Sequence, residues 1–236
     1  MVNRFWGYFM GTGLVEPIDD MRSTNPASNP ELLDALADDF VKHKYDLRQL
    51  MRTIMTSRVD QLSSHPTTSN AADTRFYTHY NVKRLPAEVL LDAIDFAAGV
   101  REKFSGIPAG TRAIELPDSN YASYFLDTMG RPKRVIACEC ERTAAPNLAQ
   151  VLHIANGDVV QRKVSDKKGR VAKLLAAKKS DEAIFSELYM STLCRPPSDE
   201  EVASCSRIVA AAENRKEGIE DILWALCNGR EFLFNH

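Results

Sequence analysis

The sequence lacks any apolar run near the roughly 20 residues that a membrane-spanning helix needs. Its first residues, MVNRFWGYFMG, do not place a basic region before an apolar one, so the chain as written is expected to be soluble and without an export signal. Internal repeats and low-complexity segments are also missing. Because 44% of the 236 residues are hydrophobic, the chain can bury a sizeable core, and we expect a globular protein.

An excess of positive charge is absent as well. Thirty Lys and Arg stand against 32 Asp and Glu, which gives a formal net charge of -2. Nucleic-acid binding usually needs a basic field, so no nucleic-acid partner is expected. One basic run, KVSDKKGRVAKLLAAKK at 163–179, could attract phosphate or an acidic polymer. A solvated helix face is the simpler interpretation of this run.

Cysteine is scarce, and its five positions are mostly set in apolar patterns: Cys138, Cys140, Cys194, Cys205 and Cys227. An odd number in such settings argues against a disulfide scaffold. No Cys-x-x-Cys pair occurs, and the histidines at 43, 65, 79 and 153 form no recognisable ligand set. We therefore expect neither a metal nor another cofactor.

Helical periodicity covers most of the chain. Apolar residues three and four apart predict helices at 2–10, 31–43, 46–57, 84–100, from 147 to about 155, 182–193, 199–212 and 217–234. Asp46, Ser180 and Ser198 are expected N-caps. A strand-like piece, RAIELPD, lies in 111–118. The predicted fold is all-α or α-dominated, with at most a small sheet in 111–142 around the CECER motif.

We expect one domain over residues 1–236, with a possible sub-boundary in the loop 61–80. This loop is rich in Ser, Thr, Asn and Pro in its first part and reads as exposed. Nearer the N-terminus, Glu16, Asp19 and Asp20 stand beside Arg22. Their alternation lacks the regular ligand spacing of a calcium loop, so a solvated turn or an ion pair of Arg22 is expected.

Ionisable and sulfur side chains are densest in CECER, residues 138–142. The segment 135–142 follows a Gly-Arg-Pro turn and ends at Ala-Ala-Pro, which is typical of a short extended segment. Side chains two apart would share a face, so the thiols would face the core while Glu139 and Glu141 face a cleft or water. The simplest interpretation is that this motif is structural.

Three functional interpretations of the motif stay open beside it. Cys138 and Cys140 with His153 could hold a soft metal, although no second cysteine pair exists. The two thiols could form a redox pair, although the small ring would be strained. Glu139 and Glu141 would stand about 6 to 7 Å apart along a strand. Paired acids at such a separation hydrolyse glycosidic bonds.

Four further residues are candidates for contacting a substrate: Tyr121, Tyr124, Arg131 and Arg142. Tyrosines can stack on sugars or simply pack in a core. Arg131 belongs to a basic cluster that is expected to pair with nearby acids, among them Asp127. Arg142 can form a bidentate pair with a carboxylate.

The run from 131 to 158, RPKRVIACECERTAAPNLAQVLHIANGD, resembles the signature of the planctomycete-type C-terminal PSD domain of unknown function. The opening NRFWGYFMGTGLVEPIDDMRSTNPASNPELLDALADDFV and the later stretches LYMSTLCRPPSDEEVASCSRIVAA and ILWALCNGREFLFNH resemble the same family, over essentially the whole chain. Such domains usually follow PSCyt and cytochrome-c-like regions. The resemblance implies an exported or periplasmic setting and supplies no catalytic residue.

One departure from the family pattern stands at Asp60, where an aromatic residue, usually tyrosine, is expected. It is either plain variation or an extra carboxylate near the motif.

Two function classes follow from the sequence. The first is a binding or interaction module of an exported polysaccharide-processing or electron-transfer system, with polysaccharide or cytochrome-like domains as partners. The second is a glycan-acting hydrolase in which Glu139, Glu141 and Asp60 supply the acid, base or nucleophile.

Overall fold

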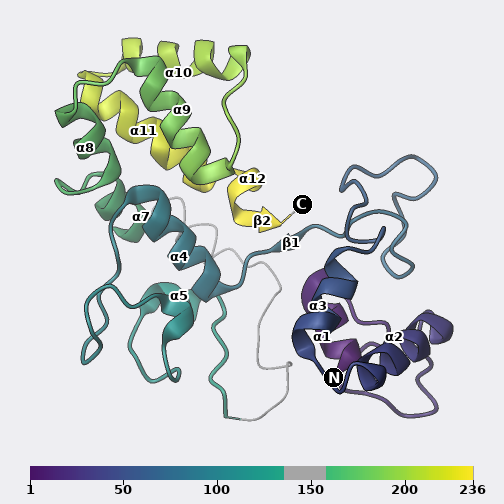
Figure 1. Cartoon of the computed structure of the whole chain (residues 1–236). Helices are drawn as coiled ribbons and strands as arrows, with labels where there is room; N and C mark the ends of the chain where they lie inside the picture. The colour runs from purple at the N-terminus through teal and green to yellow at the C-terminus, as the bar shows by residue number, and fades with distance from the viewer. Residues whose placement is uncertain (136–157, 236) are drawn as a thin grey trace. The chain divides into compact units, whose positions relative to one another are not determined.

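Helices dominate the computed structural model, which describes residues 1–135 and 158–235 (Figure 1). In this part of the chain there are eleven α-helices and one two-stranded sheet, so the prediction of an α-dominated fold is confirmed. The chain divides into two compact units, Met1–Lys83 and Arg84–Asn235. The assignment of a single domain stays a prediction, because a compact unit need not fold on its own.

The first unit is built from three helices: α1 (Val2–Met10), α2 (Pro30–Lys42) and α3 (Leu47–Met55). All three were predicted from periodicity. α3 begins as expected, because the Asp46 carboxylate accepts hydrogen bonds from the Arg48 and Gln49 N–H groups. Pro30 occupies the first turn of α2, where its missing N–H costs little.

The core of the first unit is small and gathers eight buried apolar residues: Val2, Trp6, Met10, Leu14, Leu36, Leu50, Ile54 and Tyr77. Trp6 and Tyr77 meet edge to face, with ring centroids 5.4 Å apart. Phe5 and Phe9 are partly buried against this cluster. The aromatic side chains Phe5, Trp6 and Phe9 of α1 therefore all pack in or against this core.

An irregular loop at 11–29 joins α1 to α2 and is held by the buried side chain of Asn3. The Asn3 amide accepts from the Val15 N–H and donates to the carbonyls of Val15 and Ile18, over 2.8 to 3.0 Å. Buried backbone groups need hydrogen-bond partners. Because Asn3 supplies three, it fixes the path of this loop against α1.

The second unit contains the remaining elements: α4 (Ala87–Ala98), the 3-10 helix η1 (Ala113–Glu115), α5 (Tyr124–Thr128), α7 (Asp158–Val164), α8 (Arg170–Ala176), α9 (Asp181–Leu193), α10 (Asp199–Ala211), α11 (Arg215–Asn228) and α12 (Arg230–Leu233). β1 (Lys83–Arg84) pairs with β2 (Phe234–Asn235). Ser180 and Ser198 cap α9 and α10 as predicted. The single helix expected at 217–234 divides at Gly229 into α11 and α12.

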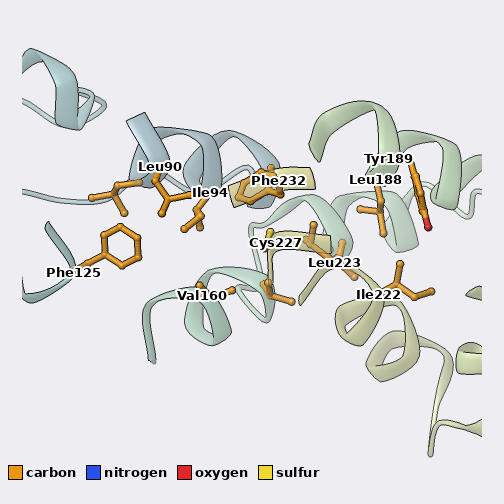
Figure 2. Packing of buried hydrophobic residues seen from close by; sticks show 14 of the residues in the cluster. Leu90, Ile94, Phe125, Val160, Leu188, Tyr189, Ile222, Leu223, Cys227 and Phe232 are labelled. Atoms are coloured by element: carbon orange, nitrogen blue, oxygen red, sulfur yellow. The ribbon is translucent and has the colours of Figure 1, made fainter. Parts of the chain in front are cut away.

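α4 contributes fully buried side chains to the core of the second unit, among them Leu90 and Ile94. Figure 2 shows these two residues with Phe125 of α5 and with Cys227 of α11. Cys227 is a free thiol, and burial raises its pKa to about 12. It is therefore an inert apolar side chain of the core, in keeping with the pattern in which its sequence places it.

The strand expected at 111–118 is wrong, since the chain forms η1 there. The cause is Asp92 of α4, whose carboxylate accepts from the N–H groups of Ala113 and Ile114 at 2.7 and 3.2 Å. These bonds take the backbone donors that a strand would need for pairing. The sheet that does form joins β1 to β2, while CECER lies outside the described residues.

The basic run at 163–179 is the expected solvated face only in part. Its lysines at 167, 168, 173, 178 and 179 are exposed, whereas two other cations of the run are not. Lys163 of α7 is buried and pairs with Asp95 at 2.7 Å and Glu102 at 2.9 Å. Arg170 donates to two carbonyls at the end of α4 and pairs with Glu187 of α9. Both cations therefore tie helices together, and a solvated face is the wrong description of them.

Candidate binding surface

The predicted site residues are spread over the chain. Glu139, Glu141 and Arg142 lie outside the described residues, so their roles stay predictions. Asp60 belongs to the first unit, where its N–H donates to Ser57 Oγ at 3.3 Å. Tyr121, Tyr124 and Arg131 belong to the second unit.

Asp60 acts electrostatically on Lys83. Burial lowers the pKa of Lys83 to about 8, and the charge of Asp60 opposes that decrease. Lys83 Nζ donates to the carbonyl of Tyr8 at 2.6 Å and to that of Phe9, at the C-terminal end of α1. A cation there complements the helix dipole. Through Lys83, Asp60 thus helps to stabilise the C-terminal end of α1. The catalytic role of Asp60 stays a prediction.

The other three candidates share the segment 119–135, which we call the Tyr124 loop. Its centre is α5, whose start is capped by Ser123 Oγ, the acceptor for the Leu126 N–H at 3.3 Å. Phe125 and Leu126 are buried in the core, whereas Tyr124 is 74% exposed. The loop therefore displays one tyrosine to solvent while the next two residues anchor it.

Arg131 joins α5 to the residues that precede this helix. Its Nη2 donates to the Tyr121 carbonyl at 2.9 Å and to Asp127 Oδ1 at 2.7 Å. The Arg131 side chain is only 5% exposed. The predicted ion pair with Asp127 is confirmed. The buried Arg131 side chain therefore stabilises the Tyr124 loop. A contact between Arg131 and a substrate stays a prediction.

Two further hydrogen bonds fix the borders of the Tyr124 loop. Arg84 Nη2 donates to the Met129 carbonyl at 2.9 Å, and Ser119 Oγ donates to the Lys133 carbonyl at 2.6 Å. Loops held by such bonds lose little further freedom when they bind a ligand. The Tyr124 loop is therefore preorganised.

The exposed side chains of this loop differ in chemical type. Tyr124 offers an aromatic face and a hydroxyl, Asp127 a carboxylate, and Lys133 and Arg134 two cations. Stacking and hydrogen bonding to a polar ligand both become possible within one segment.

Reasoning from sequence missed a cavity of about 320 Å³ in the first unit, lined by parts of the 11–29 loop and by Thr74 and Arg75. The acidic stretch beside it was expected to be a turn or an ion pair, and Arg22 does pair with Asp20 at 2.6 Å. The available signal was the density of Gly, Asn and Ser in 11–29, residues that fold irregular loops on themselves.

Within residues 1–135 and 158–235, no three His, Cys, Asp or Glu side chains gather in a way that could hold a metal ion. The expectation that the chain uses no metal or cofactor stays a prediction. Among the same residues, none of the helices has both the length and the apolar character needed to cross a membrane.

Comparison with known proteins gives a match to one protein family. No curated protein and no solved structure matches the chain. A family model does match, over residues 1–209, and it describes PSD1, a protein of unknown function (DUF1553). Since the match covers far more than half of the chain, and the sequence motifs indicate the same family, this chain belongs to the PSD1 family.

Proposed function

We propose that this chain is a binding module that contacts carbohydrate through the Tyr124 loop. One observation carries the proposal: Tyr124 is 74% exposed on a helix whose next two residues are buried. Tyrosine offers a large, stiff contact face, and a buried anchor keeps that face in place before the ligand arrives. A sugar ring can stack on such a face while its hydroxyls reach neighbouring polar groups.

Neighbouring groups of both charges support carbohydrate over a charged polymer. Asp127 is held by Arg131 at 2.7 Å and is thus a fixed acceptor for a hydroxyl. Lys133 and Arg134 are donors on the same loop. A strongly anionic or cationic ligand would meet one of these groups as a like charge. The family resemblance suggests exported machinery for polysaccharide processing or for electron transfer, and the first of these two settings would supply the same ligand class.

The test uses affinity electrophoresis of the whole chain in gels containing hydroxyethylcellulose, xylan, laminarin or alginate. The proposal expects slower migration with at least one of the three neutral polysaccharides, hydroxyethylcellulose, xylan or laminarin, and no new reducing ends when that polysaccharide is incubated with the protein. Unchanged migration with these three, or retardation by the polyanion alginate alone, would contradict it. New reducing ends would replace it with the glycan-hydrolase alternative.

A further inference from the structure

The cavity of the first unit is formed by two walls that are each fixed by hydrogen bonds. The first wall belongs to the loop 11–29. Ser28 N–H and Oγ both donate to the Leu14 carbonyl, at 2.7 and 3.2 Å. Asn25 Nδ2 donates to the carbonyls of Glu16 and Asp20, at 3.0 Å each. With the buried Asn3 behind it, this wall keeps its shape without a ligand.

The second wall contains Thr74 and Arg75 and is fixed by Asp73. The Asp73 carboxylate accepts from the N–H groups of Arg75, Phe76 and Thr78 and from the Thr78 hydroxyl, over 2.7 to 2.9 Å. These bonds lower the pKa of Asp73, with the Phe76 N–H as the largest cause. A charged carboxylate thus organises the turn that brings Arg75 to the cavity.

Tyr77 joins the two walls. Its hydroxyl lies 2.9 Å from the Thr12 carbonyl and 2.8 Å from the Gly13 carbonyl, close enough to donate to either, while its ring packs on Trp6. Burial raises the pKa of Tyr77, so the hydroxyl keeps its proton. Gly13 is needed at this junction, because a Cβ there would stand 2.5 Å from the Val15 carbonyl oxygen. The cavity is therefore a preorganised feature of the unit.

Two opposite charges line this cavity without pairing with each other. Glu16 Oε1 accepts from the Gly13 N–H at 2.5 Å, and within the described part of the chain the carboxylate makes no ion pair. The Arg75 guanidinium lies 5.7 Å from the Phe76 ring centroid and makes no hydrogen bond or ion pair among these residues. Both residues line the cavity, and neither charge is neutralised by an ion pair within the described part of the chain.

We infer that this cavity binds a small zwitterion, such as a free α-amino acid. Its ammonium would bind Glu16 and its carboxylate would bind Arg75, which can hold a carboxylate through two parallel hydrogen bonds. Thr74 and Asn25 also line the cavity. Their side-chain hydroxyl and amide oxygen are available to a polar side chain of the bound amino acid. A volume of about 320 Å³ suits a small molecule. A polyanion would face Glu16, and a neutral sugar would leave both charges unmatched.

The experiment follows the backbone amide signals of the whole, isotope-labelled chain while a probe is added. The probes are L-glutamine, N-acetyl-L-glutamine, which lacks the ammonium, and L-glutaminamide, which lacks the carboxylate. We expect saturable shifts with L-glutamine, confined to residues 12–28 and 74–75, and affinity at least about tenfold weaker for the two blocked probes. Equal affinity for all three, or no saturable shift with L-glutamine, would overturn the inference.

Glu16→Gln and Arg75→Gln test the two charges separately. Gln at position 16 can still accept from the Gly13 N–H, so the wall is kept while the charge is removed. Each variant is expected to weaken L-glutamine binding by about tenfold or more, whereas Arg52→Gln, an exposed change on α3, leaves it unaltered. Unaltered affinity in either cavity variant, with the fold intact by circular dichroism, would overturn the inference. Equal binding of N-acetylglucosamine at the same amides would do so too.

Discussion

Lys163 Nζ lies 2.7 Å from Asp95 Oδ1, and the two side chains are only 2% and 3% exposed. The pair joins α7 to α4 inside the second unit. A second carboxylate, Glu102, lies 2.9 Å from the same ammonium. Breaking such a pair on one side leaves a buried charge without compensation, which costs far more than losing a surface pair.

Replacing Lys163→Met is therefore expected to lower the free energy of unfolding by about 3 to 5 kcal/mol. Adding Asp95→Asn to that variant removes the orphaned charge and recovers part of the loss. The matched control is Arg162→Gln, because Arg162 pairs with Glu102 while 58% exposed, and its loss is expected to stay below about 1 kcal/mol. Urea denaturation measures all four proteins. Equal losses in the free energy of unfolding for Lys163→Met and Arg162→Gln would contradict this prediction.

Stability at acidic pH is expected to depend on Glu201. Two hydrogen bonds of 2.8 Å from the Arg195 guanidinium lower the pKa of this carboxyl from 4.5 to about 2. A lowered folded-state pKa stabilises the fold fully above pH 4.5, and that contribution is lost as the pH falls toward 2. The difference in free energy of unfolding between the native chain and Glu201→Gln is thus predicted to shrink between pH 4.5 and 2. A difference that is constant over this range, or one that Glu200→Gln reproduces, would rule the explanation out.

The junction of the cavity walls gives a prediction about the first unit. Tyr77→Phe keeps the aromatic contact with Trp6 and removes the hydroxyl that reaches the Thr12 and Gly13 carbonyls. We expect a loss of about 1 to 3 kcal/mol and weaker binding of L-glutamine. Tyr80→Phe removes one longer bond, of 3.3 Å to the Phe9 carbonyl, and is expected to cost less. Thermal unfolding measures the stability of both variants, and amide shifts measure their binding of L-glutamine. A larger loss for Tyr80→Phe than for Tyr77→Phe would contradict the role of Tyr77 in organising the cavity.

Elements that depend on local chemistry were predictable from sequence. α3 follows its apolar spacing and its Asp46 cap, both of which lie within a few residues of each other. The Arg131 and Asp127 pair joins residues only four positions apart and was predicted for the same reason. In the Tyr124 loop, Tyr124 was named as a candidate from sequence, with packing in the core as the alternative, and the side chain is exposed.

Features that depend on distant partners were not predictable. η1 forms because Asp92, far back in the sequence, captures its backbone donors. Lys163 looks like a surface cation until α4 supplies Asp95. The cavity was missed because Tyr77 and Gly13 meet only after folding. Sequence periodicity indicates which face of an element is apolar. It does not indicate which polar group of another element will lie against that face after folding.

The most direct test of the proposed function compares three variants in the polysaccharide gel that slows the native chain most. Tyr124→Phe keeps the stacking face and is expected to retain most of the retardation, while Tyr124→Ala weakens affinity by about tenfold. Tyr45→Ala, the control, removes an aromatic side chain of the first unit that is 65% exposed, and it is expected to migrate like the native chain. Retardation that survives Tyr124→Ala unchanged, with the fold intact, would contradict the account.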